Sequence, residues 1–75
     1  IRQEIARAYK KQCLLTDEGC ENALLIYNFL IDIYPGDEMM LIERLELHQY
    51  LNDSVGIAED EELLRKANVE SIMGY

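Results

Sequence analysis

Apolar residues recur every three or four positions through most of this chain, and this spacing constrains the fold more than any other feature. The period is that of one face of an α-helix, whereas a half-buried β-strand alternates apolar and polar residues. Only one Pro and four Gly occur among the 75 residues. We therefore expect a single all-α domain over residues 1–75, built as a small bundle or helical-hairpin array of three to four helices. Because the first residue is Ile rather than Met, we leave open that this chain is part of a longer protein.

The most apolar segment runs from about residue 17 to residue 34, and Pro35-Gly36 ends it. At ~100° per residue, its apolar side chains fill roughly half of the helix circumference. We therefore expect this second helix to contact more than one neighbour and to be central. Thr16 and Asp17 carry the side-chain oxygens that we expect to cap it.

Three further helical segments accompany it. The first carries an apolar stripe through Ile5, Tyr9 and Cys13, and the third follows the capping residue Asp37 and ends near Leu51. Residues 52–56 have the composition of a loop, so we expect the fourth helix to begin near residue 59. It would pack through its apolar face and either end or continue at Asn68; the face consists of Leu63, Leu64 and Ala67.

Charge is distributed unevenly along the chain. The net charge is −8, yet residues 1–11 carry four basic residues against Glu4 alone, a local charge of +3 that leaves −11 on the remainder. We interpret the basic first helix as the internal complement of an acidic body, with a basic docking patch as the alternative. An acidic chain is a poor ligand for nucleic acid or an anionic membrane. No apolar run reaches the roughly 18–20 residues that cross a bilayer.

The two cysteines, Cys13 and Cys20, end one helical segment and begin the next. A disulfide across this corner is compatible with the spacing, but free cysteine is among the most buried residue types. We therefore expect two reduced, packed thiols and a cytoplasmic location, and the sequence leaves the bridge open.

Residues 5–35 also carry a motif of a known family. Small residues stand at Ala6 and Ala23, aromatic residues stand at Tyr9 and Tyr27, and Pro35 closes the segment that begins with Ile5. This pattern resembles a tetratricopeptide-type helix hairpin, although the stretch between Tyr9 and Ala23 is about five residues longer. The resemblance implies an antiparallel helix pair that binds peptides or protein segments and carries no catalytic group.

Residues that could support catalysis or bind metal are sparse. His48 is the only histidine, and the residue three positions before it is Leu45, so the Glu-x-x-His spacing of di-iron bundles is missing. Two cysteines and one distant histidine do not form a zinc site. We interpret His48 as a partly exposed structural residue and expect no enzyme activity, metal or cofactor.

Apolar residues outside the expected core indicate a partner. Leu25 and Phe29 lie one turn apart on the otherwise polar side of the second helix, and a second stripe on the third helix holds Met40, Leu47 and Leu51. Coverage of Leu25 and Phe29 by the fourth helix or the tail is the structural alternative. Two adjoining exposed stripes would bind a protein partner or a second copy.

The densest run of charge is Glu59-Asp60-Glu61-Glu62. Acidic residues stabilise the first turn of a helix, which accounts for the run without any partner. An acidic docking patch is the functional interpretation. We therefore expect a non-catalytic interaction or regulatory module that presents helix faces to a protein. The alternative is an acidic inhibitor that mimics nucleic-acid charge and occupies a basic site on its target.

Overall fold

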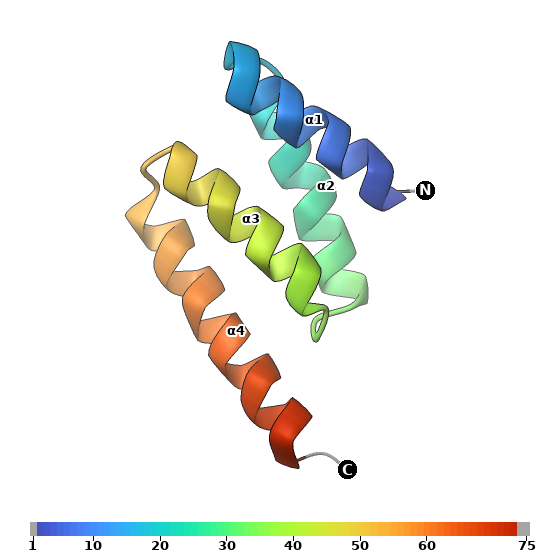
Figure 1. Cartoon of the computed structure of the whole chain (residues 1–75), viewed down its shortest axis with the longest axis vertical. Coiled ribbons are helices and arrows are strands. Elements are labelled where there is room, and N and C mark those ends of the chain that lie inside the picture. Colours follow the sequence, from blue (N-terminus) through green and yellow to red (C-terminus); the bar gives the residue numbers. More distant parts are fainter. Residues whose placement is uncertain (1, 74–75) are drawn as a thin grey trace.

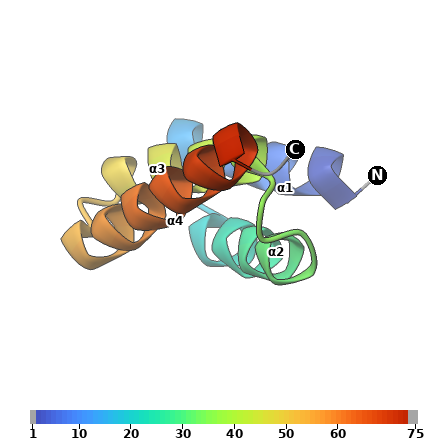
Figure 2. The same cartoon turned by 90° about the horizontal axis from the view of Figure 1, so that it is seen from below.

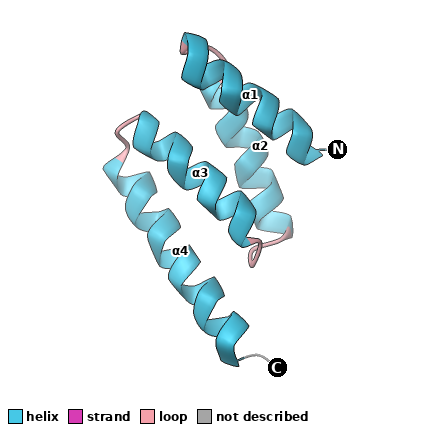
Figure 3. Ribbon diagram, viewed as in Figure 1, coloured by secondary structure: helices cyan, strands magenta, loops and turns pink. Residues whose placement is uncertain are grey.

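The structure, a computed structural model, describes the backbone of residues 2–73 and the side chains of residues 4–68. It contains the helices α1 (Arg2–Thr16), α2 (Cys20–Ile33), α3 (Glu38–Tyr50) and α4 (Ser54–Met73), and no strand within residues 2–73 (Figure 3). The expected all-α fold of three to four helices is therefore confirmed.

The helices form two antiparallel hairpins, α1 with α2 and α3 with α4 (Figure 1). α1 and α3 lie side by side and run in the same direction, and seen from below α2 lies on one side of the layer that holds the other three (Figure 2). The molecule is flat, with extents of 42 × 29 × 15 Å. Much of each helix therefore faces outward.

α3 is the helix that packs against all three others, whereas α2 packs against α1 and α3. The expected contact of residues 17–34 with more than one neighbour is present, but the most connected position belongs to α3. Seven core residues of α1, α2 and α3 are fully buried, namely Ala6, Cys13, Ala23, Tyr27, Met40, Leu41 and Leu47. From α4, Ala67 belongs to the buried core, and Leu63 and Leu64 are partly buried against it.

The turn between α1 and α2 differs from our prediction. Thr16 is the last residue of α1, and its hydroxyl donates to the carbonyl of Gln12 at 2.9 Å instead of capping α2. Asp17 takes a left-handed conformation with φ 62°, and its amide donates to the Cys13 carbonyl at 2.8 Å, which closes α1. α2 begins only after Gly19, whose φ of 78° is a conformation that glycine adopts without strain.

Cys13 and Cys20 form a disulfide, with their Cα atoms 4.8 Å apart. The expectation of two reduced thiols is therefore wrong. The short turn brings the last part of α1 against the first residue of α2, which places both sulfur atoms within bonding range. The expected cytoplasmic location loses the argument on which it rested. Separately, no described helix combines the length and the apolar character that crossing a membrane requires.

The other two turns confirm one predicted cap and correct the predicted start of the fourth helix. The Asp37 side chain accepts the Met40 amide at 3.3 Å, as expected. α4 begins at Ser54 rather than near residue 59, because the Asp53 side chain accepts the Gly56 amide at 3.0 Å and starts the helix. The loop thus spans residues 51–53 instead of the predicted 52–56, and α4 continues through Asn68 without a break.

Candidate functional site

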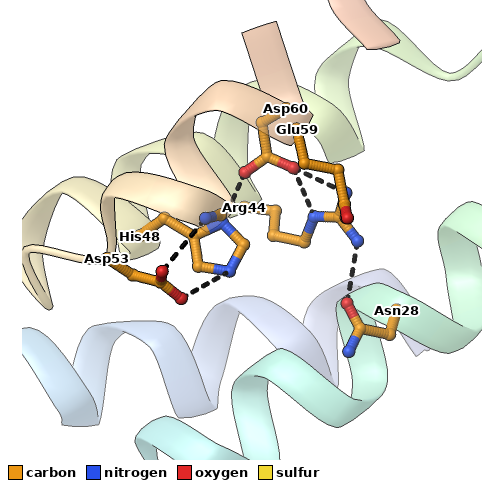
Figure 4. A network of polar contacts seen from close by, with 7 residues as sticks. Asn28, Arg44, His48, Asp53, Glu59 and Asp60 are labelled. Carbon is orange, nitrogen blue, oxygen red and sulfur yellow. Dashed lines mark hydrogen bonds and ion pairs between the residues drawn. The ribbon is translucent and has the colours of Figure 1, made fainter. Parts of the chain in front are cut away.

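A buried polar network joins α3 to α4, with Arg44 at its centre (Figure 4). The Arg44 guanidinium donates from Nε to Asp60 Oδ1 at 2.7 Å, from Nη1 to Asn28 Oδ1 at 2.8 Å and from Nη2 to Glu59 Oε1 at 3.2 Å. Asp60 is completely buried, and Arg44 is nearly so. These bonds satisfy charges that would otherwise be costly to bury.

His48 completes this network. Its Nδ1 lies 2.5 Å from Asp60 Oδ2, and its Nε2 lies 4.0 Å from Asp53 Oδ2, so each ring nitrogen faces a carboxylate. Only 7% of the residue is exposed, and the prediction of a partly exposed histidine is therefore wrong. The ring packs on α4 at Gly56, where an added Cβ would lie 2.6 Å from His48 Cδ2. Gly56 is thus the position that lets the imidazole approach the helix backbone.

The network can hold two helices together, but it offers little to a reaction. A His–carboxylate pair can activate a nucleophile that lies within hydrogen-bond reach. The two cysteine thiols are not free to act as that nucleophile, because they form the disulfide. Asp60 accepts from both Arg44 and His48, so both of its carboxylate oxygens are already bonded inside the protein. Among the residues with described side chains, no cluster of three His, Cys, Asp or Glu is placed to hold a metal ion.

A second cluster joins α1, α2 and α3 around Glu43. Its Oε1 accepts the Tyr27 hydroxyl at 2.7 Å, and its Oε2 accepts Arg7 Nε at 3.0 Å. Burial, and then the hydrogen bond to Glu43, raises the pKa of Tyr27 far above its usual value. Lys10 pairs with Glu46 one turn further along. Two of the four basic residues of the first helix, Arg7 and Lys10, are thus paired with acids of α3, which agrees with the interpretation as an internal complement for these two residues.

The predicted acidic patch is largely engaged within the protein. Asp60 is buried, so it belongs to no surface, and Glu59 pairs with Arg44. Glu62 pairs with Arg65 on α4 itself. Because α4 begins five residues earlier than expected, the run occupies its second turn rather than the first.

The structure separates the residues that we predicted to bind a partner. Leu25 is 66% exposed and Phe29 is 49% exposed, whereas Met40 and Leu47 are completely buried. The prediction that Met40 and Leu47 form a surface stripe is wrong, because α3 packs against three helices and both side chains are covered. Leu51 is 39% exposed at the end of α3, on a different part of the molecule.

Leu25 and Phe29 line a hollow of about 260 Å³ together with two isoleucines, Ile5 of α1 and Ile26 of α2. We call these four residues the Leu25–Phe29 surface. α4 packs only on α3 within the described part of the chain, so the fourth helix does not cover this surface. The sequence pattern missed the two isoleucines as members because the spacing of Ile5 matches the core stripe of the first helix.

A second hollow, of about 570 Å³, lies between α1 and α3. Its apolar part consists of Leu14, Leu15, Met39 and Ile42, and its charged part consists largely of the Arg7–Glu43 and Lys10–Glu46 pairs. Sequence reasoning missed this hollow, because it depends on how two helices distant in the chain lie side by side. Most of its charged side chains are already paired with each other, so little unpaired charge is left to attract a ligand.

The residues that carry the tetratricopeptide-type resemblance lie in the α1–α2 hairpin. Ala6, Ala23 and Tyr27 are buried there, and Tyr9 is partly buried against the same core. This burial is what any tight helix hairpin requires, so membership in that family stays a prediction. No protein-family model matches this chain, and no solved structure matches it.

Proposed function

We propose that this protein is a non-catalytic interaction module that docks a protein segment on the Leu25–Phe29 surface. One observation supports the proposal above all: large apolar side chains from two helices meet in a hollow at the surface, and no other described helix covers them. Single exposed apolar residues are common on soluble proteins, but a contiguous group of them often marks a binding site.

The shape of this surface suits a helical ligand. Leu25 and Phe29 follow each other by one turn of α2, so they form a ridge, and Ile5 and Ile26 line the hollow beside it. Amphipathic helices bind such grooves through apolar residues spaced three and four apart. Aromatic residues are also enriched among the residues that dominate binding energy.

The charge-mimicry alternative has less support from the geometry. An inhibitor that imitates nucleic acid needs many free carboxylates on one face, whereas Asp60, Glu59 and Glu62 are bound by internal partners. Salt separates the two functions. Apolar docking should persist at ~0.5 M salt, where the Debye length is about 4–5 Å, while binding through charge alone should weaken strongly.

Photo-crosslinking tests the proposed function. Benzoylphenylalanine replaces Leu25 in one variant and Val55 in a matched control, because Val55 is equally apolar, 78% exposed and located on α4. We expect position 25 to give a discrete protein adduct in a lysate of the source cells at ~0.5 M salt. An added Phe29→Asp substitution should abolish the adduct. Equal labelling from both positions, or none from position 25, would contradict docking at this surface.

A further inference from the structure

The charged residues of α2, the helix that carries three of the four residues of the Leu25–Phe29 surface, are of one sign. α2 contains two acidic residues, Glu21 and Asp32, and no basic residue. Both carboxylates are exposed, and neither has a hydrogen bond or an ion pair to another residue with a described side chain. They differ in this respect from Asp60, Glu43 and Glu46, whose charges are paired inside the protein.

The two acids bracket the apolar ridge. Glu21 lies four residues before Leu25, and Asp32 lies three residues after Phe29, so all four side chains share one face of α2. The eleven residue steps between Glu21 and Asp32 correspond to about 16 Å along the helix axis. An apolar centre with an unpaired negative charge at each end is therefore presented over about three turns.

We propose that the segment docked on the Leu25–Phe29 surface is a cationic amphipathic helix of another protein. Its apolar face would cover Leu25, Phe29 and the hollow beside them, and Lys or Arg residues about three turns apart would reach Glu21 and Asp32. This inference rests on the proposed function and adds the chemistry of the partner. The overall charge of −8 acts in the same direction, since it attracts a cationic ligand during encounter.

The same charges disfavour a second copy of the chain as the occupant. In a two-fold symmetric contact through antiparallel α2 helices, Glu21 of one copy would approach Asp32 of the other, and this would occur twice. Like charges placed opposite each other weaken association, and two molecules of charge −8 already repel. The apolar ridge alone would permit a homodimer, whereas the bracketing acids favour a partner of opposite sign.

Three labelled helical peptides test this inference. Each has about 18 residues, with Leu at positions spaced three and four apart, and the polar positions hold Lys in one peptide, Gln in the second and Glu in the third. Fluorescence anisotropy with the full chain gives the three dissociation constants at low and high salt. We expect the Lys peptide to bind most tightly, the Gln peptide more weakly and the Glu peptide weakest.

Variants of the protein separate the apolar contribution from the charged one. Leu25→Ser should weaken binding of the Lys peptide about five- to thirtyfold, which is the loss expected when the exposed two-thirds of a leucine is no longer buried. Glu21→Gln with Asp32→Asn should weaken it about two- to thirtyfold at low salt and far less at ~0.5 M salt. Val55→Ser is the matched control and should leave the affinity unchanged. Circular dichroism confirms that each variant keeps its helix content.

The outcomes distinguish this inference from the proposed function. Equal binding of the Lys, Gln and Glu peptides would overturn a cationic partner and leave apolar docking intact. A doubled solution mass that Leu25→Ser returns to the monomer value would assign the surface to a second copy instead. If no peptide binds but position 25 still crosslinks to a protein, the partner is not a cationic helix. If no peptide binds and position 25 does not crosslink, the proposed function fails as well.

Discussion

Gly56→Ala should destabilise this protein, although helix propensity alone predicts the opposite. Gly56 lies in the first turn of α4, and alanine is favoured over glycine inside a helix by up to about 1 kcal/mol. The structure places the His48 ring where the new methyl group would be, with Cδ2, Cγ and Nδ1 at 2.6, 2.7 and 2.8 Å from the added Cβ. Carbon atoms pack at about 3.5–4.0 Å, so the ring would have to move by about 1 Å.

That movement is costly because the imidazole has a buried partner. Its Nδ1 bonds to Asp60, which is fully buried, at 2.5 Å. A hydrogen bond to a charged group contributes about 1.5–3 kcal/mol, and overpacking by one methyl group costs about 1–3 kcal/mol. After the propensity gain is subtracted, we expect the free energy of unfolding of Gly56→Ala to fall by about 1–2 kcal/mol. In a domain of this size the melting temperature should then drop by roughly 5–15 °C.

Urea unfolding followed by far-ultraviolet circular dichroism measures this change. Gly36→Ala is the matched control, because nothing lies within 4 Å of its added Cβ, and it should stay within about 0.5 kcal/mol of the wild type. In a His48→Ala background the obstacle is gone, so Gly56→Ala should become neutral or stabilising. A single Gly56→Ala variant at least as stable as the wild type would refute the close packing of His48 on α4.

Three further predictions concern the disulfide and the buried polar groups. Replacing Cys13 and Cys20 by Ser should lower the free energy of unfolding by about 2–3 kcal/mol, as expected for so short a loop, and a reducing agent should change the melting temperature of the wild type but not of the variant. Asp60→Asn should cost about 3–5 kcal/mol in urea unfolding because it removes the buried carboxylate that pairs with Arg44, whereas Glu61→Gln on the exposed face should change little; equal effects would contradict the burial of Asp60. Burial, followed by a hydrogen bond to a carboxylate, raises the folded-state pKa of Tyr27 above the unfolded value of about 10. Its contribution to stability is therefore fully present below pH ~10 and is lost as the pH rises further, and Tyr27→Phe should remove this part of the alkaline loss in urea unfolding.

Sequence periodicity was sufficient to predict that the helices exist, because each helix carries an apolar face that is driven away from water. Local chemistry predicted two boundaries. Pro35 stops α2, since it lacks an amide proton and restricts the preceding residue, and Asp37 caps α3 through its own side chain. Charge patterning also predicted that the basic residues of α1 would pair within the protein, and the structure shows this for Arg7 and Lys10.

Other local signals competed, and tertiary context decided between them. Residues 52–56 resemble a loop in composition, yet Asp53 caps α4 from within that stretch, and Gly56 is retained where His48 packs. The pairing of Cys13 with Cys20 depends on the angle at which α2 leaves the turn, and cysteine spacing alone does not determine that angle. Thr16 bonds back to its own helix because Gly19 takes over the start of α2.

For the candidate surface, too, the sequence predicted one part and the packing of the helices decided the other. A helical pattern tells which residues share a face, so the sequence alone placed Leu25 and Phe29 together on the polar side of α2 and Met40 with Leu47 on α3. Whether a face is covered depends on how many helices pack against it. α3 has three neighbours and buries Met40 and Leu47, whereas the outer face of α2 keeps Leu25 and Phe29 exposed. Periodicity along one helix contains no information about the others, and only the packed structure supplies it.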